Sequence, residues 1–486
     1  MTISLIVLLF IIALFIRLCA VKKTGLNGCD AFYFLICREV FQKELTFKID
    51  TKNKYLCEDP IQNYPQGFTY FLALIPNRVL EKYYWTISPI IDCFVLLIPL
   101  MLFDLNLLSV IIFVPLYLIS FSSISETLYL TSRQLGVMLY ILSVLSFYNY
   151  LSFNTPTSLF FTVITFILTF VTHKFSSQTL FFSMLYFTFA FKSFIPVLFF
   201  VGIYLLCILL TSGHQLQTLL SHFEFIKFWT KEQKMMGAHQ LFDSNFYSSK
   251  GYQFESVFMK KLKFVKKYLF ENSYILIVIA ILLLNQANLS HFELIMFQLT
   301  LFVYFFGAIT FFIPFMRGFG FGAQYGKYSL ILFMCGIVNV DVSKLDLGIF
   351  LLSTFLYILV FFKLYRFFKS ISLSANSRSD NLINFLKQFK EKRVFCLPSN
   401  LNDEIAYKTS HHMIWGTHSS PLKLVKSFYP VLQDKIENVL EKEEAEFLIL
   451  EKNYINNQSI NVPKWVIIFE DDHFFVLENS EIHFHP

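Results

Sequence analysis

The chain begins with the run Ile3-Ser4-Leu5-Ile6-Val7-Leu8-Leu9-Phe10-Ile11-Ile12-Ala13-Leu14-Phe15-Ile16. This run is almost unbroken Leu, Ile, Val and Phe, and Arg17 follows where its side chain can extend to the membrane surface. The segment has neither a basic start nor a small-x-small cleavage site, so we do not interpret it as a signal peptide. We predict that Met1 to Ala20 spans a membrane.

Apolar runs of similar length recur along the chain, each long enough to cross a hydrocarbon core of about 30 Å. With the first segment they predict a polytopic α-helical membrane protein of about eleven transmembrane helices. The further candidate spans are 86–103, 107–121, 134–152, 158–172, 177–191, 193–211, 271–288, 292–314, 328–340 and 346–364. The pair on either side of Lys192 is either a hairpin or one broken helix.

Composition supports this class. The 486 residues include 62 Phe and 25 Tyr, and only 15% of positions are charged, whereas soluble domains are about a quarter charged. Gly and Pro are sparse and the 8 Cys are scattered, which excludes collagenous, disordered and disulfide-scaffold chains. Residues 1–364 hold 26 Lys and Arg against 18 Asp and Glu, and residues 365–486 hold 14 against 16. A basic membrane part therefore precedes a slightly acidic tail.

The polar connections between spans are unequal in length. Residues 21–85, 212–270 and 365–486 are long and, with eleven spans, all fall on one face, whereas the connections near 105, 155, 290 and 343 are short. A face that concentrates irregular chain is expected to carry the working site. Its lysines would place it in the cytoplasm by the positive-inside rule, but that rule is weak for loops near or above roughly 60 residues. We expect this face to be external.

The tail has the pattern of a small α/β domain. Short apolar runs predict strands at 393–398, 413–416 and 447–450 and a hairpin formed by 465–469 and 474–477, and apolar residues at helical spacing predict a helix over 422–440. We therefore expect two domains, a transmembrane domain over 1–364 and a soluble C-terminal α/β domain over 365–486, with the second covering the site rather than catalysing.

The loop after the first span reads Asn27-Gly28-Cys29-Asp30-Ala31-Phe32-Tyr33-Phe34-Leu35-Ile36-Cys37-Arg38-Glu39-Val40. A helix that starts at Asp30 would present an apolar stripe formed by Phe32, Leu35, Ile36 and Val40, so we expect it to lie along the membrane surface. Asp30 is then either a cap on the positive end of the helix dipole or a catalytic base just outside the hydrocarbon. The two roles are compatible.

Residues 55–76 lead the chain back to the membrane through Tyr64-Pro65 and an aromatic helix that ends Leu74-Ile75-Pro76. An Asp soon after the first span, an aromatic surface helix and a Tyr-Pro return together resemble the first external loop of the type C membrane glycosyltransferases. That superfamily includes polyprenyl-phosphate-sugar-dependent transferases and the catalytic subunits of oligosaccharyltransferases. The motif-like similarity covers 27–76, and the general layout is similar over the whole chain.

The resemblance implies that Asp30 is the catalytic base. It also implies paired loop acids, but Ala31 follows Asp30 here, and a lone carboxylate is a poor site for Mg²⁺ or Mn²⁺. Glu58 and Asp59 are candidates to complete an acceptor or metal site. No metal or cofactor is assigned, and a divalent cation is left open.

Cations on the long-loop face are candidates to bind a donor phosphate. They are Arg133, and Arg317 with Lys327 in a stretch with 4 of the 16 Gly of the chain. The family has an external loop at the lipid phosphate that this stretch resembles. The alternative for each cation is a membrane-flanking residue that extends to the surface. Asp92 and Asp104 lie in or near a span, where an ionisable group is usually functional.

We therefore expect an inverting glycosyltransferase, transferring a hexosyl or pentosyl group from a polyprenyl-phosphate donor to a hydroxyl of a glycan, lipid or protein. It would lie in the plasma membrane, or in the endoplasmic reticulum membrane of a eukaryote, with its site and tail on the external face and no nucleic-acid partner. A transporter or flippase of lipid-linked saccharides is the main alternative, and a scaffolding membrane protein is another. Smooth spans and unequal loop lengths disfavour a transporter.

Overall fold

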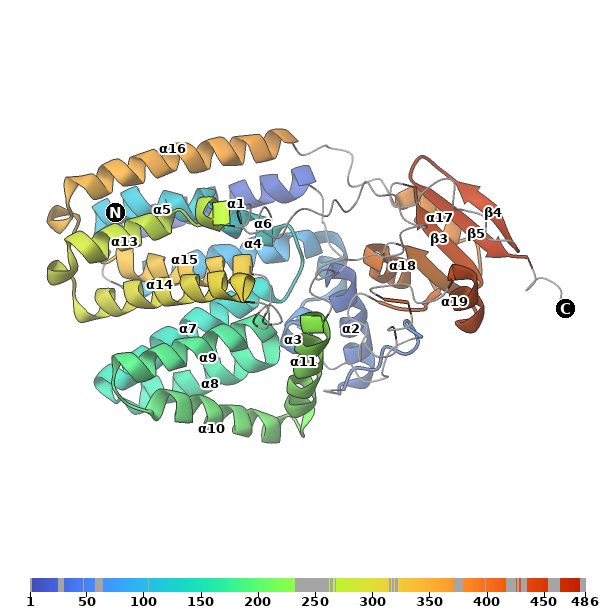
Figure 1. Ribbon diagram of the computed structural model, residues 1–486, viewed down its shortest axis with the longest axis horizontal. Coiled ribbons are helices and arrows are strands. Elements are labelled where there is room, and N and C mark those ends of the chain that lie inside the picture. The colour runs from blue at the N-terminus through green and yellow to red at the C-terminus, as the bar shows by residue number, and fades with distance from the viewer. Residues whose placement is uncertain are drawn as a thin grey trace.

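The computed structural model describes residues 2–24, 30–46, 48–56, 64–103, 105–231, 268–313, 322–370, 379–397, 399–416, 435–452 and 464–480, and a few isolated residues between these ranges. Figure 1 shows a bundle of long helices that lie side by side, with a smaller domain of strands and short helices beyond one end of the bundle.

The bundle consists of long helices that run between two ends of the molecule (Figure 1). They are α1 (Thr2–Thr24), α4 (Asn77–Leu102), α5 (Leu107–Ile119) with the short α6 (Phe121–Thr127), α7 (Arg133–Phe153), α8 (Pro156–Thr172), α9 (Lys174–Ala190), α10 (Ile195–Leu210), α13 (Tyr274–Leu284), α14 (His291–Phe312), α15 (Gly322–Ile337) and α16 (Leu347–Ser370). Three other helices lie at the end nearer the small domain: α2 (Asp30–Glu44), α3 (Gly67–Ala73) and α11 (His214–Lys231).

Several of these helices are suited to a bilayer. Five helices of the described part are long and apolar enough to cross one, up to seven if two bent pairs each count as one span, and two further apolar helices are shorter. Large apolar side chains also remain exposed on the outer helices, for example Phe15 at 67%, Leu209 at 76% and Leu351 at 65%, which lipid can cover. The polytopic helical fold is thus as predicted, but the count of eleven spans is not confirmed.

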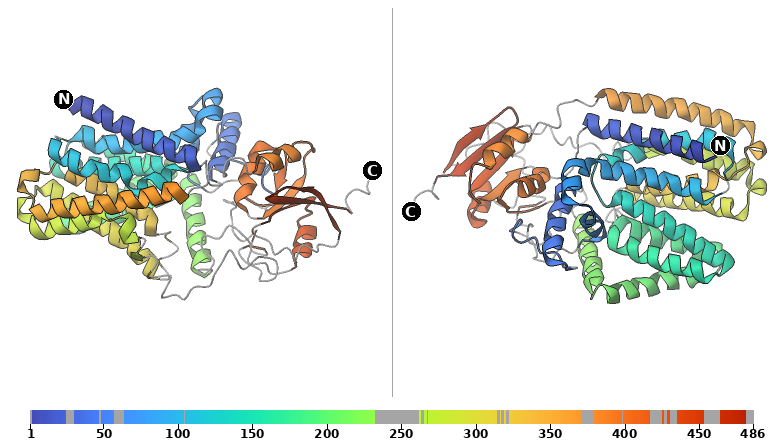
Figure 2. Two further views of the ribbon diagram at one scale, coloured as in Figure 1. Left: turned by 90° about the horizontal axis from the view of Figure 1, so that it is seen from above. Right: turned by 180° about the vertical axis from the view of Figure 1, so that it is seen from behind.

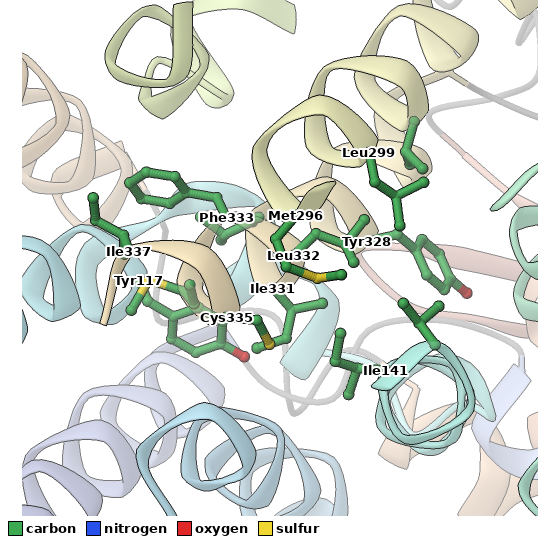
Figure 3. Close-up of a cluster of buried hydrophobic side chains, with 14 of the residues drawn as sticks. Tyr117, Ile141, Met296, Leu299, Tyr328, Ile331, Leu332, Phe333, Cys335 and Ile337 are labelled. Carbon is green, nitrogen blue, oxygen red and sulfur yellow. The ribbon is translucent and has the colours of Figure 1, made fainter. Parts of the chain in front are cut away.

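Helix α15 forms the centre of the bundle. Its residues from Leu330 to Cys335 are all fully buried, and Figure 3 shows them packed with Tyr117 of α5, Ile141 of α7 and Met296 of α14. A helix that is apolar on all sides is expected in the middle of a bundle rather than at its surface. Because lipid is as apolar as these side chains, close packing and polar contacts are what hold such helices together.

The segment around Lys192 is a turn. Helix α9 ends at Ala190, Lys192 has a positive φ of 50°, and α10 begins at Ile195 and runs back beside α9. The two helices are therefore a hairpin, the first of the two predicted alternatives. After α10 the chain bends by 116° through Ser212 and Gly213, and α11 lies across the end of the bundle.

The C-terminal domain contains a mixed five-stranded sheet in the order β2-β1-β3-β5-β4. Its strands are β1 (Arg393–Leu397), β2 (His412–Met413), β3 (Phe447–Glu451), β4 (Trp465–Glu470) and β5 (Phe474–Asn479). The neighbours of β1 are parallel to it, and β5 is antiparallel to β3 and β4. Helices α17 (Asp380–Leu386) and α18 (Asn402–Lys408) pack on one face of the sheet and α19 (Ile436–Lys442) on the other.

The predicted strands and hairpin are present, although β2 is shorter than expected. The predicted helix over 422–440 is wrong in its described part, because the helix begins only at Ile436 and residues 428–429 form a bend. There, Phe428 and Tyr429 pack around Trp415, so burial rather than helix formation explains the apolar spacing. Helix α16 continues to Ser370, beyond the predicted domain boundary at 364.

The loop that follows α2 joins the C-terminal sheet. Tyr55 forms a parallel bridge with Met413 of β2, and its buried phenol donates to the Asp403 carboxylate at 2.6 Å. A Cβ on Gly416 would lie only 2.7 Å from the Tyr55 ring. Helix α18 also packs on α2, and both views of Figure 2 show the small domain beside α2. The tail is thus held against the loop that carries Asp30.

Candidate active site

Asp30 occupies the position predicted for it, the first residue of α2. The helix does not lie free on a membrane surface, however. The face away from the predicted apolar stripe, which includes Phe34, Cys37 and Arg38, is also buried, since α2 is held between α3 and α18. Arg38 donates to the carbonyl oxygens of Leu72 at 3.0 Å and Ile75 at 2.8 Å, beyond the end of α3. These contacts fix α2 and leave the side chain of Asp30 24% exposed.

Among the described residues, Arg133 forms an ion pair with Asp30. It begins α7, and its Nη2 lies 4.0 Å from the Asp30 carboxylate, while its Nη1 donates to Glu126 at 3.0 Å. The guanidinium therefore lies between two carboxylates that come from different helices. Its electrostatic attraction favours the ionised form of a nearby carboxylate, which is the form that a base requires.

Tyr64 lies beside this pair. Its ring packs edge-on against Tyr33 and Phe34 of α2, with centroids 6.2 and 6.0 Å away. Burial raises the pKa of Tyr64 to about 12, and the neighbouring Asp30 carboxylate acts in the same direction. The phenol therefore stays protonated at neutral pH and can donate a hydrogen bond.

The wall behind Arg133 is tightly packed. A Cβ on Gly136 would lie 2.7 Å from the Cβ of His173, and a Cβ on Gly67 would lie 2.6 Å from the hydroxyl of Thr172. These two glycines let α7 and α3 approach the junction of α8 and α9, where the Nδ1 of His173 lies 3.2 Å from the Tyr328 hydroxyl. Four helices are thereby brought around Asp30.

Lys327 has a different environment from the one expected. It is 3% exposed, and its ammonium contacts Asp92 at 2.6 Å and the side chain of Gln134. Asp92 also accepts from Arg17 at 2.5 Å and from Tyr117 at 2.9 Å. Lys327 is therefore neutralised inside the bundle rather than presented to a ligand, and its predicted contact with a phosphate stays a prediction.

Four other predicted residues lie outside the described part of the chain. They are the cation Arg317 and the acids Glu58, Asp59 and Asp104. Among the described residues, no three His, Cys, Asp or Glu side chains are grouped as a metal site would require. The described group that lies beside Asp30 is the guanidinium of Arg133, not a further carboxylate.

One cavity is described, and it is remote from Asp30. It has a volume of about 160 Å³ and lies at the short connections on the opposite end of the bundle, lined by Asn285, Ser290, Glu293, Asn339 and Asp341 among others. Glu293 and Ser290 there form a capping box at the start of α14. Its polar lining therefore serves a helix end.

Sequence reasoning did not single out several residues of the site. Glu126, Tyr64 and His173 reach it from three separate segments, and no spacing in the sequence links them. The run Thr172-His173-Lys174, polar residues between two apolar stretches, was the signal that could have indicated a second polar wall.

No protein-family model matches the sequence, and no curated protein matches it in sequence. Solved structures do match its fold. The apo oligosaccharyltransferase of Archaeoglobus fulgidus superposes with a TM-score of 0.56 at 10% identity, over 93% of this chain and 69% of that one. The same enzyme in complex with Zn and sulfate gives a TM-score of 0.50 at 12% identity, over 91% and 68%. The chain therefore has the fold of a type C membrane glycosyltransferase, as the resemblance of its first long loop implied.

Proposed function

We propose that the chain transfers a sugar or glycan from a lipid-phosphate-linked donor to an acceptor, with Asp30 as the base. The observation that carries the proposal is the placement of Asp30 at the start of α2, beside Arg133, at the end of the bundle covered by the C-terminal domain. The fold neighbour is an oligosaccharyltransferase, which favours group transfer over transport of the same lipid. A glycan, lipid or protein acceptor is compatible with the site.

The chemistry requires a base and cations. In the inverting reaction that we propose, the acceptor hydroxyl gives its proton to Asp30 while its oxygen bonds to the anomeric carbon of the sugar. The bond from that carbon to the phosphate oxygen breaks, and the electron pair leaves with the phosphate. The departing phosphate gains negative charge, so cations stabilise the transition state more than the bound donor.

Arg133 would act first on Asp30. Its described ion pairs are both with carboxylates, Asp30 and Glu126, so it would position Asp30 electrostatically. The phenol of Tyr64, protonated at neutral pH, lies beside them and interacts with Asp30 and Ser132. The phosphate role predicted for Arg133 and Arg317 remains part of the proposal.

A divalent cation is suggested by the neighbour that was crystallised with Zn and sulfate. The described residues do not fit one, because Arg133 rather than a further carboxylate faces Asp30 and no group of three ligands occurs among them. No step of the proposed reaction therefore passes through a metal.

We also propose that Asp30 and the tail face the exterior of the cell or the lumen of the endoplasmic reticulum. A lipid-linked sugar that has been flipped across the bilayer presents its headgroup there. The basic residues on this face do not argue against an external location, because the positive-inside rule is weak for long loops.

The test is to incubate the purified full chain, reconstituted in liposomes, with radiolabelled polyprenyl-phosphate sugars and a mixture of hydroxyl acceptors. The proposal predicts label covalently joined to an acceptor. Movement of labelled donor across the bilayer without any transfer would instead support a flippase and would contradict the proposal.

A further inference from the structure

Helix α11 carries an unusual inner face. His214, Thr218 and His222 recur every fourth residue, so they lie on one side of the helix. They are 4%, 2% and 8% exposed, whereas the apolar Leu220 and Phe223 on the other side are each 55% exposed. The helix thus buries these three polar residues against the bundle, while large apolar side chains remain exposed on its other side.

These inward side chains carry polar atoms that lack hydrogen-bond partners in the part of the chain that the structure describes. The hydroxyl of Thr218 has none, and among the described residues the ring of His214 meets only the backbone of Tyr64. Burying a polar group without a partner costs free energy, so native proteins rarely do it. Such groups on one face indicate that something outside the described residues satisfies them.

His222 presents a hydrogen-bond donor. Its Nε2 accepts from the side-chain amide of Gln178, whose oxygen in turn accepts from the Tyr325 hydroxyl at 3.2 Å. With Nε2 accepting, the proton of the neutral ring is on Nδ1. That Nδ1 is buried and has no acceptor among the described residues.

Lys174 completes the face with a positive charge. It is one turn before Gln178 on α9, near enough to His222 for their charges to interact. Its ammonium lies 4.8 Å from the centre of the Tyr64 ring, and no carboxylate of the described chain pairs with it. An ammonium, a ring N–H and a hydroxyl, with no acid among them, suit an anion with several acceptor oxygens.

The position relative to Asp30 fits a leaving phosphate. The ring of Tyr64 contacts Lys174, and the same residue interacts with Asp30, so both groups lie near Tyr64. In inverting displacement the base and the group that assists departure lie on opposite sides of the sugar, and in inverting glycosidases they are roughly 6.5–9.5 Å apart.

We propose that Lys174, His214, Thr218 and His222 bind the phosphate group of the lipid-linked donor. This inference rests on the proposed function for the identity of the ligand, but the site itself does not require that transfer occurs.

Binding of farnesyl phosphate to the purified full chain in detergent tests the proposal, with inorganic phosphate as competitor. Lys174→Gln should weaken binding about tenfold or more, because it removes a charge-assisted contact. Lys174→Arg should recover most of the affinity. Thr218→Val, which keeps the side-chain shape, should weaken binding several-fold. Lys227→Gln, an exposed change on α11, is the matched control and should bind normally.

Unchanged binding in Lys174→Gln and Thr218→Val would overturn the site. Inorganic phosphate that competes as well as the lipid would overturn the assignment to a lipid-linked ligand. The two proposals can fail separately. Binding that depends on Lys174 but is not accompanied by sugar transfer would support this site and contradict the proposed transferase function. Sugar transfer that Lys174→Gln does not affect would support the transferase function and contradict this site.

Discussion

Asp92→Asn should destabilise the membrane bundle strongly. Asp92 is fully buried and is the shared partner of Arg17 at 2.5 Å and Lys327 at 2.6 Å. Each unit-charge attraction is worth about 4 kcal/mol at 4 Å for an effective dielectric constant of 20. Removing one member of a buried pair costs about 3–5 kcal/mol, since a charge is left uncompensated, and here two cations lose their anion at once.

Arg17→Met provides the internal comparison, because it leaves the Asp92–Lys327 pair neutral. It should therefore cost less than Asp92→Asn. The assay is the fraction of detergent-solubilised protein that stays monodisperse after heating, with Asp472→Asn, an exposed position in the turn between β4 and β5, as the control. Asp92→Asn that melts like the wild type, or Arg17→Met that costs as much, would refute the idea that this carboxylate holds the bundle together.

Three further predictions concern the loop face. Tyr55→Phe removes the hydrogen-bond donor to buried Asp403, which should cost about 1–3 kcal/mol of docking free energy. Proteolysis between the domains should therefore be faster. An unchanged cleavage rate would argue against docking through this contact. Arg133→Ala should abolish most sugar transfer and Arg133→Lys should restore only part, because a point charge replaces a planar fork; full recovery with Lys would count against the orienting role. Gln388 is exposed on the tail, whereas Ser399 is buried and would be a poor labelling position. A cysteine introduced by Gln388→Cys should react with an impermeant thiol reagent in intact cells or sealed luminal-side-out vesicles. A cysteine that does not react there would place the tail on the opposite side of the membrane from the one proposed.

The sequence predicted what local pattern determines. Asp30 begins a helix because polar Asn27 and Gly28 precede an aromatic run, and the β4–β5 hairpin follows from two apolar runs across a charged turn. The ion pair of Lys327 with Asp92 could not be predicted in this way. It lies in the second turn of α15, and only the packing of α15 against α4 decides that it meets Asp92 rather than a ligand.

The buried polar residues of α11 were not predicted for a similar reason. Along α11, His214, Thr218 and His222 alternate with apolar residues as in any amphipathic helix, and the expected orientation would place the polar side toward water. The bend after α10 instead places the side that carries these three residues against the bundle. A bend angle of this kind depends on tertiary contacts that the sequence pattern does not report.

The most direct test of the account is the rate of sugar transfer by Asp30→Asn in the liposome assay, beside Asp50→Asn as a matched control in an exposed part of the same loop. Asparagine preserves the shape of Asp30 but cannot accept the acceptor proton. We predict a loss of roughly 10²-fold or more for Asp30→Asn, with normal expression and normal farnesyl phosphate binding, and no loss for Asp50→Asn. Near-normal transfer by Asp30→Asn would remove Asp30 from the mechanism and contradict the account.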